Sequence, residues 1–264
     1  MNWSSPGELW LVVSLQHSLR YFFFSGWFFL LTLALTRRKR SAHRRVQIRP
    51  FTRKQVWREI ALSVSTFAIF GLAFIPLVWA AKDDYTQIYM DATEKSLWYI
   101  PVSVVLMVLL HDAYFYWTHR LMHTSALYRA VHLSHHRSNN PSAWAAFAFH
   151  PFEAVIELGI FPIVLFGVPA HPIALFSFLT IVSAHSAMIH CGYEVFPKAV
   201  ALTRAGSWLV SSTHHNLHHH FVTGNYGLYF SFWDRWMNTQ RPDYDARVRD
   251  VVAPSAAAMP ARAE

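Results

Sequence analysis

Cysteine is almost absent from this chain of 264 residues, which contains Cys191 and no other thiol. One thiol excludes a disulfide within the chain, and it excludes an iron–sulfur or zinc site built from four cysteines. We therefore interpret Cys191 as a small, buried apolar residue. Glycine is scarce as well, with nine residues, and the G-x-G-x-x-G motif of a dinucleotide-binding turn does not occur.

Charged residues are also few. They make up 14% of the chain, against roughly 25% in an average soluble protein, and hydrophobic residues make up 53%. This imbalance predicts that lipid is the main solvent of the chain. Nine of the 23 Lys and Arg residues lie between Arg37 and Lys54, directly after an apolar run. A basic block in that position is typical of a cytoplasmic anchor facing anionic lipid, which argues against nucleic-acid binding.

Long apolar runs divide the chain into spans. We expect transmembrane helices over about residues 12–35, 60–81 and 97–116, each long enough for the ~30 Å hydrocarbon core. The positive-inside rule places the basic loop in the cytoplasm, and with it the end of the third span. The first residues lack the basic n-region of a cleavable signal peptide.

A fourth apolar segment, residues 154–189, has Gly167, Pro169 and Pro172 near its middle. Two short helices joined by this turn would form a hairpin that enters and leaves by the cytoplasmic face. The alternative is one long span, which would carry the last histidines of the chain to the opposite side from the earlier ones. We favour the hairpin because it keeps all the histidines on one side.

These spans predict one all-α integral membrane domain over residues 1–240, with its core at about 100–240. The domain would be a bundle of about four transmembrane helices, hairpin included, with residues 191–240 as a cytoplasmic helical cap. Residues 241–264 would be a flexible tail. We place such a protein in a bacterial inner membrane.

Histidine is the residue that the chain has in excess. Thr213 to His220 reads T-H-H-N-L-H-H-H, and the spacing of His215, His218 and His219 repeats that of His132, His135 and His136. On a helix, residues three and four apart share a face, so each H-x-x-H-H box presents three imidazoles to one side. His119 and His123 form a further pair four apart.

Adding His185 and His190 gives ten candidate ligands, which is too many for one metal ion and fits a dinuclear site at the cytoplasmic face. Neutral imidazole suits iron, zinc, copper and nickel, and the sequence alone does not choose among them. Asp112 lies on the stripe of His119 and could accept the second ring N–H of a ligand. We expect His111, His150 and His214 to support the ligands or face the substrate, while His17, His43, His171 and His220 are not assigned as ligands.

Four segments together resemble the fatty acid hydroxylase/sterol desaturase superfamily of integral membrane di-iron oxygenases. They read D-A-Y-F-Y-W-T-H-R-L-M-H (112–123), H-L-S-H-H (132–136), F-H-P-F-E (149–153) and H-H-N-L-H-H (214–219). The N-Y-G that begins at Asn225 and the W-D-R around Asp234 extend the resemblance, and we expect the side chains of Asn225 and Asp234 to support the ligands. It implies a helical membrane bundle whose histidines hold two iron ions, with His119, His123, both boxes and, less closely, His185 and His190 as ligands.

The resemblance also implies that O2 oxidises a C–H bond of a bilayer lipid, giving an alcohol or an alkene. Each turnover needs two electrons, and we expect a separate ferredoxin, cytochrome or reductase to supply them. The basic block 37–54 could dock an acidic donor, although we favour its role as a topology anchor. A purified sample could carry zinc in place of iron.

Two other classes of protein are weighed against the oxygenase. A membrane zinc hydrolase is disfavoured because no H-E-x-x-H occurs and no Glu lies inside a histidine box. A metal transporter or store would place ligands in the middle of spans or in disordered tracts. The choice between hydroxylation and desaturation, and among sterol, fatty acyl and other lipids, is left open.

Overall fold

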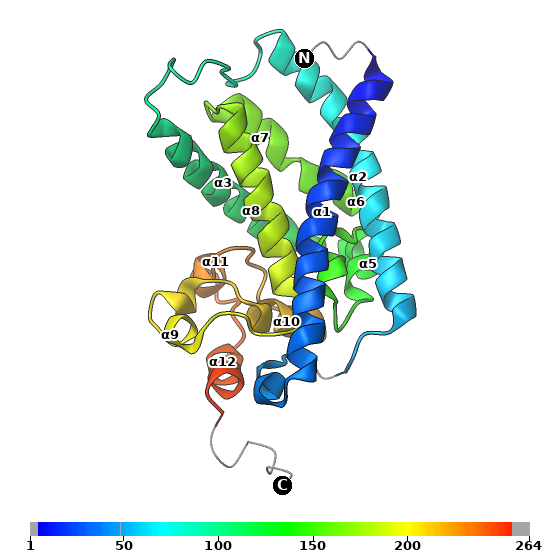
Figure 1. Ribbon diagram of the computed structural model, residues 1–264, viewed down its shortest axis with the longest axis vertical. Helices are drawn as coiled ribbons and strands as arrows, with labels where there is room; N and C mark the ends of the chain where they lie inside the picture. Colours follow the sequence, from blue (N-terminus) through cyan, green and yellow to red (C-terminus); the bar gives the residue numbers. More distant parts are fainter. Residues whose placement is uncertain (1–4, 48, 255–264) are drawn as a thin grey trace.

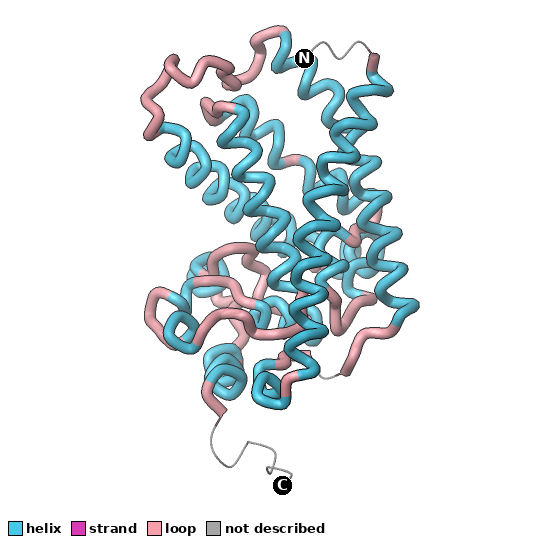
Figure 2. Tube along the Cα trace, viewed as in Figure 1, coloured by secondary structure: helices cyan, strands magenta, loops and turns pink. Residues whose placement is uncertain are grey.

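The computed structural model describes residues 5–47 and 49–254, and these residues form helices and loops without a strand (Figures 1 and 2). Four of the helices are long and apolar enough to cross a membrane, which confirms the predicted all-α bundle of about four spans. They are α1 (Pro6–Arg37), α2 (Arg53–Lys82), α3 (Tyr99–Met122) and α8 (Pro172–His190).

Local sequence explains where these helices begin. The hydroxyl of Ser5 accepts a hydrogen bond from the backbone N–H of Glu8 at the start of α1, and Thr52 caps α2 in the same way. The imidazole of His171 accepts from the N–H of Ile173 at the start of α8, which opens with a proline. His171, for which no metal role was expected, is therefore a helix cap.

Residues 151–190 form the expected hairpin rather than one span. Helices α6 (Pro151–Leu158) and α7 (Ile160–Gly167) run in one direction, and α8 returns in the opposite direction, packed between α1 and α3 (Figure 1). The turn between them contacts the loop that joins α2 to α3, since Ile88 pairs with Ala170 and the N–H of Gln87 donates to the carbonyl of Leu165. The turn therefore lies at the end of the bundle opposite to the end of α8.

A kink at Gly159 separates α6 from α7. A Cβ at Gly159 would lie 2.1 Å from the hydroxyl oxygen of Tyr114 on α3, so a larger residue requires the Tyr114 side chain to move. The core of the bundle fills the space between the hairpin and helices α1, α2 and α3. It is rich in aromatic rings, among them Tyr21, Phe67, Phe147, Phe161 and Phe178.

We define the cap as residues 191–254, which lie below the bundle in Figure 1. Short helices η1 (Lys39–Arg44), α4 (Ser125–Leu127), η2 (Tyr128–His132), α5 (Leu133–His136) and η3 (Ala143–Phe147) connect the long ones. The helices of the cap are α9 (Lys198–Ala201), η4 (Gly206–Trp208), α10 (Ser212–Phe221), α11 (Phe232–Trp236) and α12 (Tyr244–Val252).

Helix α12 corrects the expectation of a flexible tail from residue 241. Its Tyr244, Val248 and Val252 are buried against Ala201 and Leu217 of the cap. These apolar residues recur at intervals of four, which gives a short helix one buried face. The run of small residues that follows masks this periodicity in the sequence; residues 255–264 lie outside the described part of the chain.

Candidate metal centre

Nine of the ten predicted histidine ligands converge in two groups. In each group the ligand nitrogens all lie within 4.8 Å of one another. The first histidine group is His119, His123, His132, His136 and His218, and the second histidine group is His135, His190, His215 and His219.

Four separate segments of the chain build these groups. His119 and His123 come from the end of α3, and His190 is the last residue of α8. The first box follows α3 through the π-helical turn η2 and helix α5, and the second lies on α10. The hairpin is what returns His190 to the same end of the bundle as the boxes.

Each H-x-x-H-H box divides its histidines between the two groups. In the first box, His132 and His136 join the first group and His135 joins the second. In the second box the assignment is reversed, with His218 in the first group and the pair His215 and His219 in the second. Residues four apart thus act together, and the residue between them serves the other group, which explains why the same spacing occurs twice.

The distances within the first group match a coordination sphere. The Nε2 atom of His132 lies 3.1 Å from the Nε2 atoms of both His119 and His136, and His136 lies 3.0 Å from His218. Two metal–nitrogen bonds of about 2.1 Å that meet at a right angle place their nitrogens about 3.0 Å apart. The spacing is therefore that of ligands around one ion.

The second group has the same spacing. The Nε2 atom of His215 lies 2.9 Å from that of His190 and 3.1 Å from that of His219, and His135 lies 3.4 Å from His190. All four rings are buried. In the first group, His123 is the one ring that is partly exposed.

Hydrogen bonds at the far side of the rings fix which nitrogen carries the proton. The Nδ1–H of His119 donates to the carbonyl of Tyr226 at 3.0 Å, that of His218 to Gly224 at 2.8 Å, and that of His190 to Ser186 at 2.7 Å. With the proton on Nδ1, each Nε2 presents a lone pair to its neighbours. Lone pairs that face one another at about 3 Å repel, and a bound cation removes this repulsion.

Burial keeps these imidazoles neutral. Burial, followed by the nearby imidazoles, lowers the pKa of His132, His136 and His218 well below the usual 6.5. The same causes act on His215 and His219. Metal ions bind the neutral form of imidazole. The residues present therefore fit two metal ions held by nitrogen ligands.

His185 is the predicted ligand that the structure places elsewhere. Its Nε2–H donates to the carbonyl of Leu228 at 2.7 Å, and its ring lies beside Tyr229. His185 and His190 are five residues apart, and at 3.6 residues per turn their side chains point roughly 140° apart on α8. Only His190 can therefore face the metal centre.

Asp112 makes no hydrogen bond to a histidine ring among the residues that the structure describes, which corrects the role expected for it. Its carboxylate accepts hydrogen bonds from the backbone N–H groups of Tyr229 at 2.8 Å and Phe230 at 3.1 Å. It therefore anchors the loop that follows α10 to helix α3, and it acts on the metal centre only through that loop.

Asp234 and Asn225 support the same loop. The carboxylate of Asp234 accepts from the N–H groups of Tyr226 and Gly227, each at 2.8 Å, and Tyr226 in turn accepts from His119. The side-chain amide of Asn225 donates to the carbonyl of His214 at 3.0 Å. The W-D-R and N-Y-G segments thus hold the carbonyls that orient two ligands of the first group.

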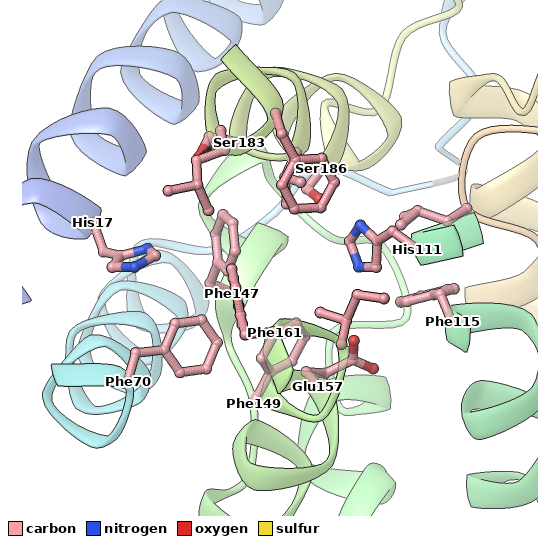
Figure 3. A pocket seen from close by; sticks show the side chains of 15 residues that line it. His17, Phe70, His111, Phe115, Phe147, Phe149, Glu157, Phe161, Ser183 and Ser186 are labelled. Carbon is pink, nitrogen blue, oxygen red and sulfur yellow. Dashed lines mark hydrogen bonds between the residues drawn. The ribbon is translucent and has the colours of Figure 1, made fainter. Parts of the chain in front are cut away.

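His214, His111 and His150 were expected to support the ligands or face the substrate, and the structure places each of them differently. His214 is a buried residue of α10 outside both histidine groups, with its Nε2 3.5 Å from a carboxylate oxygen of Asp234. His111 hydrogen-bonds with the hydroxyl of Tyr229 through Nδ1 and faces a cavity (Figure 3). His150 caps helix α6 by accepting from the N–H of Phe152, and it contacts neither histidine group.

Sequence reasoning missed Glu153. The Nδ1–H of His132 donates to a carboxylate oxygen of Glu153 at 2.8 Å, and both side chains are buried. A carboxylate in this position fixes the ring and strengthens its other nitrogen as a ligand. The available signal was the presence of two glutamates, Glu153 and Glu157, four residues apart in an otherwise apolar helix.

An apolar cavity adjoins the metal centre. A smaller space is lined by histidines of both groups, including His119, His132 and His215. It shares Phe115, Phe149, Glu157, Ser186 and Leu228 with a larger cavity of about 50 Å³ in the middle of the bundle. Figure 3 shows this larger cavity surrounded by aromatic rings. The arrangement can place an apolar group beside the two histidine groups.

The histidine groups lie within a segment of the chain that matches a known protein family. The sequence profile described as fatty acid hydroxylase matches residues 104–239, more than half of the chain. The chain belongs to the fatty acid hydroxylase family. The matched residues contain every histidine of both groups, from His119 on α3 to His219 on α10. No solved structure shows a significant match to the chain.

Curated relatives of this family member share less than a third of its residues. A Delta(7)-sterol 5(6)-desaturase of Gibberella zeae is 29% identical over 75% of the chain and 60% of its own length. Lathosterol oxidase of Homo sapiens is 29% identical over 70% of the chain and 61% of its own length. A Delta(7)-sterol 5(6)-desaturase of Schizosaccharomyces pombe is 26% identical over 86% and 75%. The chain thus spans about three fifths of the length of the first two relatives.

The contact between Glu153 and His132 predicts a measurable effect on metal binding. The variant Glu153→Gln keeps an oxygen that can accept the Nδ1–H but loses the charge that strengthens the ligand. We expect metal affinity to fall by about 10- to 100-fold. Elemental analysis after dialysis against a graded series of chelator concentrations measures this change. Glu157→Gln is the matched control, since Glu157 has no contact with a ligand ring, and an equal loss of metal in both variants would contradict the role of Glu153.

Proposed function

We propose that this family member is an integral membrane oxidoreductase that oxidises an unactivated C–H position of a lipid, by hydroxylation or desaturation, with O2 and two iron ions. The observation that carries the proposal is the pair of histidine groups beside an apolar cavity inside a membrane bundle. The names of the relatives, desaturase and oxidase, support oxidation of a sterol or a similar lipid.

Nine nitrogen ligands and no carboxylate in either group suit several transition metals. Oxidation requires a metal that changes its oxidation state, which favours iron over zinc as the working ion. Zinc found in a purified sample would not exclude this function, because neutral imidazole binds zinc as well.

When bound, two iron ions supply the reduction of O2 and the oxidation of the C–H bond. The protein contributes the geometry. Backbone carbonyls of Tyr226, Gly224 and Ser186 hold the Nδ1–H groups of three ligands, so their Nε2 atoms keep one direction. The rings of Phe115 and Phe149 line both the larger cavity and the smaller space beside the ligands, and burial of the second group keeps water away from it.

The proposal includes the side of the membrane on which the metal centre lies and the source of its electrons. The basic block 37–54 lies at the same end of the bundle as the histidines, which supports a metal centre on the cytoplasmic face of a bacterial inner membrane. The 264 residues have no dinucleotide motif and no cysteine cluster. The two electrons per turnover therefore come from a donor outside these residues, such as a ferredoxin, a cytochrome or a reductase.

Mass spectrometry of membrane lipids tests this function. Cells that express the chain are compared with cells that express a His136→Ala, His190→Ala double variant, which removes one ligand from each group. A new lipid heavier by one oxygen indicates hydroxylation, and one lighter by two hydrogens indicates desaturation. Identical lipids in both strains, at equal protein levels and with an electron donor present, would contradict the proposal.

A further inference from the structure

The carboxyl group of Glu157 lies in the cavity without a partner. Its side chain is 8% exposed, and it makes no hydrogen bond or ion pair with any other residue that the structure describes. Figure 3 shows its oxygens directed into the cavity, among Phe115, Phe149 and Phe161. A buried polar group without a partner costs about 1–3 kcal/mol. A carboxyl group held in this way is suited to a bound molecule that supplies the missing hydrogen bond.

Glu157 lies close to the metal centre. It lines both the larger cavity and the smaller space beside the histidines. It follows Glu153 by four residues on α6, so about 6 Å along the helix separates it from the carboxylate that holds His132. A group bound to Glu157 would therefore sit within about one helical turn of the ligand cluster.

The remaining polar side chains that line the larger cavity belong to serines and histidines, and none of them carries a fixed charge. The Ser186 hydroxyl lines both spaces beside Glu157, and the ring of His111 faces the cavity with its Nδ1 engaged by Tyr229. Farther along, His17 packs among Phe67, Phe70 and Phe74. No Lys or Arg lines the larger cavity. A carboxylate or phosphate headgroup would lack a countercharge here, whereas a hydroxyl group can both donate to and accept from such neighbours.

We propose that Glu157 binds a hydroxyl group of the lipid substrate and holds it next to the metal centre. The substrate is then a hydroxylated lipid whose reacting carbon lies near the carbon that bears the hydroxyl, and an unsubstituted acyl chain is a poor substrate. This inference rests on the proposed function, because it assigns the cavity to the substrate of that function.

Lipid binding to the metal-loaded protein in nanodiscs tests the inference without turnover. The probes form two matched pairs, 5α-cholestan-3β-ol with 5α-cholestane, and 1-octadecanol with octadecane. We expect the wild type to bind at least one alcohol roughly tenfold or more tightly than its hydrocarbon partner. The pair that shows the preference distinguishes a ring lipid from a chain lipid as the source of the hydroxyl.

Two variants of Glu157 separate binding from folding. Glu157→Leu removes the hydrogen bond and leaves an apolar side chain, so it is expected to fold and to keep both metal ions but lose the preference for the alcohol. Glu157→Gln can still donate and accept, so it is expected to retain most of the preference. A preference in Glu157→Leu equal to that of the wild type, or no preference in the wild type, would overturn the inference.

The outcomes also separate this inference from the proposed function. If lipids are oxidised in cells but Glu157→Leu binds and oxidises the alcohol as the wild type does, the function stands and the hydroxyl site fails. If the alcohol preference depends on Glu157 while no lipid is oxidised, the site stands and the oxidation fails.

Discussion

Replacing His135 by alanine is expected to lower the metal content of the purified protein from two ions per chain to one, and to abolish lipid oxidation. The second histidine group has four members, so this variant leaves it three imidazoles. The first group has five members, and His218→Ala leaves it four. We therefore expect the first group of His218→Ala to release its ion only at chelator concentrations higher than those that empty the second group of His135→Ala. The His218→Ala variant should still lose lipid oxidation, because one ion of the pair is disturbed.

Elemental analysis of the purified variants measures both effects. His185→Ala is the matched control, because His185 bonds to the carbonyl of Leu228 and lies outside both groups. It should keep two ions per chain. Two ions per chain in His135→Ala, or the loss of an ion from His185→Ala, would contradict the assignment of histidines to the two groups.

Replacing Asp234 by alanine is expected to destabilise the cap by about 3–5 kcal/mol. The Asp234 carboxylate is completely buried and accepts from the N–H groups of Tyr226 and Gly227 and from the Thr239 hydroxyl at 2.7 Å. Its removal leaves the two N–H groups buried and unpaired, at about 1–3 kcal/mol for each group without a new partner, whereas the Thr239 hydroxyl keeps its hydrogen bond with Tyr116. The total stability of many proteins is only 5–15 kcal/mol, so little folded protein should accumulate.

Thermal denaturation in detergent, followed by tryptophan fluorescence, measures this loss. Asp243→Ala is the matched control, since the Asp243 side chain is 47% exposed and pairs with Arg241 at 3.0 Å on the surface. An exposed ion pair contributes about 0–1 kcal/mol, so the control should unfold close to the wild type. Equal unfolding temperatures for Asp234→Ala and the wild type would contradict the anchoring role.

Asp234 also connects stability to metal binding. It holds Tyr226, whose carbonyl accepts the Nδ1–H of His119. Any Asp234→Ala protein that does fold should therefore lose the ion of the first group more readily than that of the second. Metal analysis of the folded fraction reports this difference.

The spans were predictable because membrane helices leave a strong local signal. Twenty apolar residues are needed to cross the hydrocarbon core, and the chain has such runs where α1, α2 and α3 were expected. The hairpin was predicted because the histidines that precede it in the sequence and those that follow it must lie at the same end of the bundle to share one site. Helix α12 was missed because three buried residues on one short helix leave a weak pattern among small residues.

The supporting residues were less predictable than the ligands. Asp112 lies on the same stripe of α3 as His119, yet its partners are backbone N–H groups more than one hundred residues later. Glu153 reaches His132 only because α6 begins beside the first box. Such contacts depend on how two segments pack, and no spacing within one segment encodes them.

The sequence alone determined the kind of ligand, the repeated spacing of the boxes and the end of the bundle at which they gather. It did so because imidazoles three and four apart share a helix face, and because long apolar runs fix which ends of the helices lie together. Tertiary structure decided which histidine serves which group. A box on one helix offers nitrogens in two slightly different directions, and the positions of α3, α8 and α10 determine which partners each nitrogen meets. For the same reason His190 faces the centre and His185 does not.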